Sequence, residues 1–161
     1  KEVEAIIGLD MSLPQAYDKY RPNWLLYKTL QFAANLGLSR WLYSPDKEIH
    51  SLSNGSLNPK EKSIYKALFY RRPLSKAIIK EAEEVKSNAK LVKQDKVPAI
   101  PYLLFVSNGQ GTGFARKDWQ DMSKDFAKDH KNVQLKSFDV PHYIHSYIPD
   151  ELAKEIRKFL K

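Results

Sequence analysis

Two histidines, His142 and His145, lie three residues apart in the segment SFDVPHYIHSYIPDELAKEIRKFLK, residues 137–161. A neutral imidazole can take the proton of a hydroxyl nucleophile and return it to a leaving group, so one of the two could be a general base. Two imidazoles on one turn could instead share a metal ion, or either ring could simply pack within the turn. A metal site requires further ligands, and no third histidine or carboxylate stands at a characteristic spacing. The pair therefore indicates acid–base chemistry or packing, and we expect neither a metal nor another cofactor.

The stretch SNGQGTG contains three glycines, Gly109, Gly111 and Gly113. Backbone N–H groups in such a loop can bind phosphate. Their spacing matches neither G-x-G-x-x-G nor G-x-x-x-x-G-K-[ST], the two common phosphate-binding patterns. We therefore interpret the stretch as a flexible turn after a strand.

The histidines follow the last of three apolar runs that predict buried strands, over residues 3–9, 99–106 and 133–138. Residues 17–93, between the first two runs, have a helical pattern with expected helices over 24–36, from a cap at Asn58, and along Leu74, Ile78 and Val85. Trp119, Met122 and Phe126 mark one more helix. Pro149 opens the last helix, on which Leu152, Ile156, Phe159 and Leu160 share a face.

This order of elements predicts the α/β class with a parallel sheet, because buried-type strands alternate with helical crossovers. Three strands alone would leave both sheet edges with unpaired backbone groups, so we expect further strands upstream. The first residues, KEVEAIIGLD, have no initiator methionine and enter an apolar run almost at once. We therefore expect the chain to begin in the middle of a protein.

The tail VPHYIHSYIPDELAKEIRKFL resembles the end of α/β-hydrolase-fold proteins, in which the catalytic histidine lies between the last strand and the last helix. In the same way VEAIIGLDMSLP resembles the sixth strand of that family, IPYLLFVSNGQGTG the seventh and NVQLKSF the eighth. The resemblance implies the C-terminal part of an α/β-hydrolase fold, a mostly parallel sheet with a helical cap. Residues 1–16 and 94–161 would form the core, and residues 17–93 the cap.

The resemblance implies a serine nucleophile on a G-x-S-x-G turn, which this sequence lacks. GLSRW, with Gly37 and Ser39, and NGSLN, with Gly55 and Ser56, have no second glycine. The serine and the oxyanion-hole donors would therefore lie on a preceding segment, the N-terminal half of the same protein.

Within the family pattern, His142 is the expected general base and His145 a structural companion. The acid that orients such a base usually follows the seventh strand, but SNGQGTGFARKD has glycine and glutamine at those positions. Asp118 and Asp121 belong to the next expected helix. Asp139 is too near His142 in sequence to face its ring.

A minority of the family carries the acid after the sixth strand, where this chain has Asp10. The resemblance thus implies Asp10 as the triad acid. An aspartate at a strand end can also serve only to cap a turn, and that alternative stays open.

The resemblance implies the function of a hydrolase, a serine esterase/lipase-like or amidase-like enzyme acting on a small ester, thioester or amide. Two alternatives remain: a dehalogenase-type hydrolase with a carboxylate nucleophile, and a catalytically incomplete relative that serves as a binding module. The ten aromatic residues between Tyr17 and Tyr70 could wall an apolar pocket in the cap, although helix packing explains most of them.

Composition and charge limit the classes of partner that we expect for this chain. The 161 residues carry a formal net charge of +8, from 27 basic and 19 acidic residues, but no clustered basic stripe, so we do not expect nucleic-acid binding. The longest apolar runs, such as AIPYLLFV, are too short for a membrane span. The absence of cysteine assigns no compartment, and no feature assigns an oligomeric state.

Overall fold

The structure is a computed structural model that describes residues 3–18, 20–46, 49–71 and 74–161. The chain divides into two compact units, one formed by residues 1–18 and 89–161 and the other by residues 19–88. We call them the sheet unit and the helical unit. One boundary between them falls inside the helix α5 (Lys76–Gln94). None of the helices in the described ranges is both long and apolar enough to cross a membrane.

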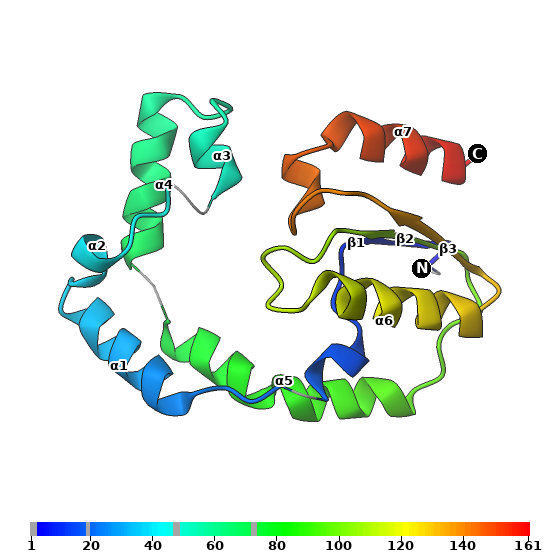
Figure 1. Cartoon of the computed structure of the whole chain (residues 1–161), viewed down its shortest axis with the longest axis horizontal. Coiled ribbons are helices and arrows are strands. Elements are labelled where there is room, and N and C mark those ends of the chain that lie inside the picture. Colours follow the sequence, from blue (N-terminus) through cyan, green and yellow to red (C-terminus); the bar gives the residue numbers. More distant parts are fainter. Residues whose placement is uncertain (1–2, 19, 47–48, 72–73) are drawn as a thin grey trace. The chain divides into compact units, whose positions relative to one another are not determined.

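The sheet unit is built on three parallel strands in the order β1 (Ile6–Leu9), β2 (Tyr102–Val106) and β3 (Val133–Ser137) (Figure 1). Ile6 lies opposite Tyr102, and Tyr102 lies opposite Val133. All five residues of the central strand β2 are buried, as its continuous apolar run indicates. The α/β class and the parallel sheet are therefore confirmed.

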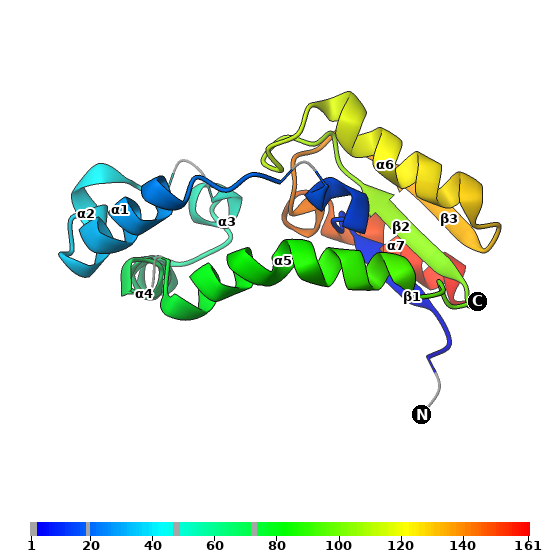
Figure 2. The same ribbon diagram turned by 90° about the horizontal axis from the view of Figure 1, so that it is seen from below.

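Two helices, α6 (Arg116–Asp129) and α7 (Pro149–Phe159), cover opposite faces of this sheet (Figure 1, Figure 2). Alternate side chains of β2 point to opposite faces. Leu103 and Phe105 pack with Leu152 of α7, whereas Val106 packs with Trp119 of α6. Two short 3₁₀ turns, η1 (Pro14–Tyr17) and η2 (Ile144–Ser146), complete the two cores through Ala16 and Ile144.

The helical unit contains α1 (Trp24–Asn35), α2 (Ser39–Leu42), α3 (His50–Ser53), α4 (Pro59–Arg71) and the first part of α5. Asn58 caps α4 as expected: its Oδ1 accepts the N–H groups of Lys60 and Glu61, and Glu61 accepts the N–H of Asn58 in return. Gly37 ends the α1 segment in a left-handed conformation, at φ +77°.

Several expected element ends were wrong. β1 begins at Ile6 and not at residue 3, and Val3 is exposed. β2 begins only at Tyr102, because Pro98 and Pro101 lack the N–H groups that a ladder needs. β3 ends at Ser137, one residue before the end expected.

The helix ends also differ. Leu74 precedes α5 in a left-handed conformation and is not part of its apolar face. Leu160 follows the last turn of α7 and is 62% exposed, so only the other three apolar residues of that helix reach the core.

Candidate functional site

Asp10 directly follows β1 and is buried, with its side chain fully excluded from solvent. Its backbone adopts a left-handed conformation at φ +54°, which aspartate tolerates better than most residues. Its N–H donates to the carbonyl oxygen of Phe105 at 2.9 Å, which continues the pairing with β2 for one step. The bend then directs the carboxylate along the carboxyl edge of the sheet.

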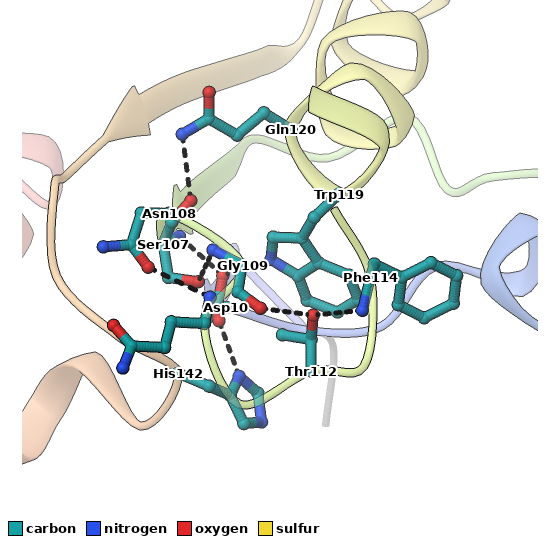
Figure 3. A network of polar contacts seen from close by, with 10 residues as sticks. Asp10, Ser107, Asn108, Gly109, Thr112, Phe114, Trp119, Gln120 and His142 are labelled. Carbon is teal, nitrogen blue, oxygen red and sulfur yellow. Dashed lines mark hydrogen bonds and ion pairs between the residues drawn. The ribbon is translucent and has the colours of Figure 1, made fainter. Parts of the chain in front are cut away.

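The carboxylate of Asp10 accepts hydrogen bonds at both oxygens (Figure 3). Oδ1 accepts the backbone N–H of Ser107 at 2.6 Å and the indole Nε1–H of Trp119 at 2.9 Å. Oδ2 lies 2.6 Å from Nδ1 of His142. The two residues that the sequence pointed to, 132 positions apart, are therefore in direct contact.

His142 lies in the loop between β3 and η2, where its backbone N–H donates to the backbone carbonyl oxygen of Gln110 at 2.8 Å. Because a carboxylate only accepts hydrogen bonds, Nδ1 of His142 carries the proton toward Asp10. In the neutral ring Nε2 is then an acceptor, and it has no partner among the residues that the structure describes. The side chain is 24% exposed, so this nitrogen can be reached from outside.

The glycine stretch is a turn that positions this loop. Ser107 Oγ accepts the N–H of Gly109, and Asn108 Oδ1 accepts the N–H of Gln110. The turn is joined to the histidine loop because the N–H of Asn108 donates to Val140 at 2.9 Å. The stretch therefore fixes the backbone on which His142 is carried.

Asp139 lies outside the buried pair and anchors the same turn. Its Oδ1 accepts the side-chain amide of Asn108 at 3.1 Å and lies 3.0 Å from the guanidinium of Arg116. The Asn108 hydrogen bond, and then the charge of Arg116, hold the pKa of Asp139 below its usual range. As expected from its position in sequence, its contacts are with this anchor and not with the ring of His142.

The other acidic candidates lie on α6. Asp121 pairs with Lys117 at 2.5 Å and with Lys124 at 3.4 Å, and these lysines lower its pKa. Asp118 stands in the first turn of the same helix. Neither makes a hydrogen bond to His142.

His145 lies in η2 with its ring exposed, and its centroid is 6.1 Å from that of Tyr143. Throughout the described ranges, no cluster of three histidine, aspartate or glutamate residues is arranged to hold a metal ion.

Trp119 is the site residue that sequence reasoning missed. Its apolar spacing placed it on the buried face of α6, where it is 3% exposed. The structure adds the hydrogen bond to Asp10 and an edge contact with the ring of His142, with centroids 6.1 Å apart at 85°. No sequence signal distinguishes it from Trp24 or Trp41, because a buried indole reads as an apolar residue.

Some of the aromatic residues of the helical unit border an open depression of about 460 Å³ on α1 and α5. Trp24, Tyr27 and Ile79 supply its apolar lining, and Lys28 and Glu83 supply charges. The rings of Trp24 and Tyr27 contact each other at 5.6 Å. Most of the expected aromatic wall therefore does not line this depression.

No known family model matches the chain. The sequence is 22% identical over 168 aligned positions to the uncharacterized protein YbdG of Bacillus subtilis (strain 168). The match covers all of this chain and 51% of that protein, so the chain spans about half the length of the curated relative that it matches.

Proposed function

We propose that this chain supplies the general base and the acid of a serine hydrolase of the α/β-hydrolase fold, with His142 as base and Asp10 as acid. The observation that carries the proposal is the 2.6 Å contact between Nδ1 of His142 and a fully buried carboxylate oxygen of Asp10. That contact leaves Nε2 as an unoccupied acceptor, which is the arrangement of an oriented catalytic histidine.

The positions of the two residues along the fold support the proposal. Asp10 follows β1, the glycine turn follows β2 and His142 follows β3, so all three lie at the carboxyl ends of adjacent parallel strands. Ligands of parallel α/β sheets bind at this edge. The order β1-β2-β3 is also what strands six, seven and eight of the resembling family would require.

The chemistry would proceed as acyl transfer. Nε2 of His142 takes the proton of a serine hydroxyl as its oxygen bonds to the carbonyl carbon, and returns that proton to the departing alcohol, thiol or amine. Asp10 stabilises the imidazolium while its two N–H donors keep the carboxylate in place. Water then attacks the acyl-enzyme with His142 again as base, releasing the acid and the free serine.

The serine and the oxyanion-hole donors would come from the half of the longer protein that this chain does not span. A single protein would thus carry both parts of the site, with the helical unit acting as the cap that selects a small ester, thioester or amide. No cofactor enters this scheme.

Labelling the full-length protein with a fluorophosphonate probe tests the proposal. We expect one adduct on a serine outside this chain, located by mass spectrometry, and slowing of labelling by at least about 10³-fold in His142→Ala and Asp10→Asn. His145→Ala and Asp121→Asn are matched controls of the same residue types and should label like the parent protein. Equal labelling of His142→Ala and the parent would refute the assignment of the base.

A dehalogenase-type hydrolase is the second candidate, because the same His142–Asp10 pair can activate water against an ester formed on a carboxylate nucleophile. Such a protein would not react with the fluorophosphonate but would release halide from a haloalkane. The third candidate, a catalytically incomplete relative that serves as a binding module, was suggested by the absence of an acid after β2. The contact of Asp10 with His142 weakens that reason. A protein that neither labels nor releases halide would favour the binding module.

A further inference from the structure

Tyr143, the residue after His142, has a strained backbone. Its φ of +62° lies in the left-handed region, which bulky side chains seldom adopt. Among the described residues other than glycine, only Asp10 and Leu74 share a positive φ. Strain of this kind persists where the surrounding structure enforces it, and it is concentrated at functional sites.

The backbone of Tyr143 is fixed from both sides. Before it, the backbone N–H of His142 donates to the backbone carbonyl oxygen of Gln110 at 2.8 Å. After it, Ile144 is fully buried in the core on the α7 face of the sheet, and the N–H of Ser146 donates to the carbonyl oxygen of Tyr143 at 2.8 Å. The turn therefore cannot relax without disturbing either the histidine or the core.

The strained position does not serve packing, because the side chain of Tyr143 points outward and the residue is 65% exposed. Its ring centroid lies 4.5 Å from that of His142, at an interplanar angle of 48°. Its hydroxyl makes no hydrogen bond to any described residue. The fold thus holds a largely exposed aromatic ring directly against the imidazole, and only the smaller part of the residue's surface is buried.

We propose that Tyr143 forms a wall of the leaving-group subsite and favours an aromatic or other apolar leaving group over a small one. This inference rests on the proposed function. His142 must protonate the departing atom through Nε2, so the leaving group has to lie within hydrogen-bond reach of the imidazole. Tyr143 is the exposed ring in contact with that imidazole, and an aromatic face interacts favourably with apolar and aromatic groups.

Two esters with a common acyl group provide the test, because methyl acetate and benzyl acetate form the same acetyl-enzyme and differ only in the alcohol released. In the full-length protein we would measure the ratio of kcat/KM for benzyl acetate to that for methyl acetate. Tyr143→Asn should lower this ratio by about 3- to 10-fold, the range expected for one lost aromatic contact. Tyr143→Phe keeps the ring and should retain the ratio.

Thermal unfolding supplies an independent measurement, since asparagine accepts the left-handed conformation better than tyrosine. The Tm of Tyr143→Asn should equal or exceed that of the parent protein. A clearly lower Tm would show that the ring stabilises the fold, and would overturn the inference. Leu74→Asn is the matched control, because Leu74 has the same backbone strain in the helical unit, and its ester ratio should stay at the parent value.

The outcomes separate this inference from the proposed function. If His142→Ala loses turnover of both esters and Tyr143→Asn keeps the parent ratio, the proposed hydrolase function is supported and the proposed role of Tyr143 is refuted. An equal fall for both esters in Tyr143→Asn would also overturn it, because Tyr143 would then only orient His142. Undiminished turnover in His142→Ala would refute the proposed function itself, and the inference with it.

Discussion

The indole N–H of Trp119 donates to Oδ1 of Asp10 at 2.9 Å, although 109 residues separate the two in sequence. Together with the N–H of Ser107, it gives Oδ1 two donors and leaves Oδ2 to His142. Both donors are buried, so the carboxylate cannot exchange them for water without opening the core. The orientation of the Asp10 carboxylate therefore depends on β2 and α6, which position its two donors, as much as on β1.

Replacing Trp119 by phenylalanine should destabilise the protein by about 2–4 kcal/mol. The change removes a hydrogen bond to a buried carboxylate, worth about 1.5–3 kcal/mol, and leaves a small cavity where the larger ring was. Urea unfolding measures the effect as a lower midpoint with an unchanged slope. Trp41→Phe is the control: that residue is 90% exposed, and its replacement should stay within about 0.5 kcal/mol of the parent. Equal values for the two variants would contradict the assigned hydrogen bond.

Asp10→Asn should reverse the tautomer of His142. The amide oxygen of the new side chain would stay with the N–H groups of Ser107 and Trp119, so its NH₂ group would face Nδ1 of His142. Nδ1 must then accept, and the proton moves to Nε2, which can no longer act as a base. We expect turnover in the full-length protein to fall by about 10⁴-fold, the effect of the equivalent change in a serine-protease triad.

Nitrogen-15 chemical shifts of the His142 ring report this tautomer directly. Asp139→Asn is the control, because Asp139 hydrogen-bonds to Asn108 and leaves the ring untouched, so Nδ1 should keep its proton. Retention of the Nδ1–H form in Asp10→Asn would show that the carboxylate does not set the tautomer.

Alanine should be tolerated much less well at Gly109 than at Gly113. Both glycines are left-handed, at φ +84° and +83°, so either substitution carries a strain of about 1–2 kcal/mol. At Gly109 the added Cβ would also lie 3.2 Å from Cβ of Trp119 and 3.3 Å from Cα of Arg116, whereas at Gly113 nothing lies within 4 Å. The difference in unfolding free energy between the two variants isolates the steric part, which we expect to exceed about 1 kcal/mol. The idea that this turn packs tightly on α6 fails if the two variants are equally stable.

The contribution of Asp139 to stability should depend on pH. Asn108 and Arg116 lower the pKa of this carboxyl in the folded state, so the folded state favours its ionised form. The stabilisation is then fully present above the unfolded-state value of 3.8 and disappears as the pH falls through the lower folded-state pKa. The Tm difference between the parent and Asp139→Asn should accordingly be constant above about pH 5 and shrink below it. Because the pair is exposed, about 1 M salt should reduce the same difference at neutral pH, and a difference insensitive to both pH and salt would rule out an electrostatic origin.

Much of the sheet unit could be predicted from the sequence because its core follows simple periodicities. The continuous apolar run of β2 indicates a strand buried on both faces, and the 3.6-residue spacing on α6 and α7 indicates helices that cover it. Asp10 and His142 each follow a predicted parallel strand, and the carboxyl ends of adjacent parallel strands meet at one edge. Their proximity is thus a consequence of topology.

The remaining features depend on tertiary contacts that leave no local pattern. A tyrosine carries no signal for a left-handed conformation, so the strain at Tyr143 appears only once Ile144 is anchored in the core. Apolar spacing continued past the true end of α7 to Leu160, because nothing in the sequence marks where the last turn stops. The hydrogen bond of the Trp119 indole N–H could not be predicted either. The spacing of apolar residues along a helix indicates which rings are buried, but not which hydrogen bonds they make.

The long sequence separation between Asp10 and its hydrogen-bond partners affects the order in which the sheet unit can fold during synthesis. Ribosomes add about 5–20 residues per second, so Asp10 is synthesised roughly 5–20 s before Ser107, 97 positions later, can donate to it. Throughout that interval β1 has no β2 to pair with, and the carboxylate must remain hydrated. His142 follows β3, so its contact with Asp10 can form only after all three strands of the sheet have been synthesised.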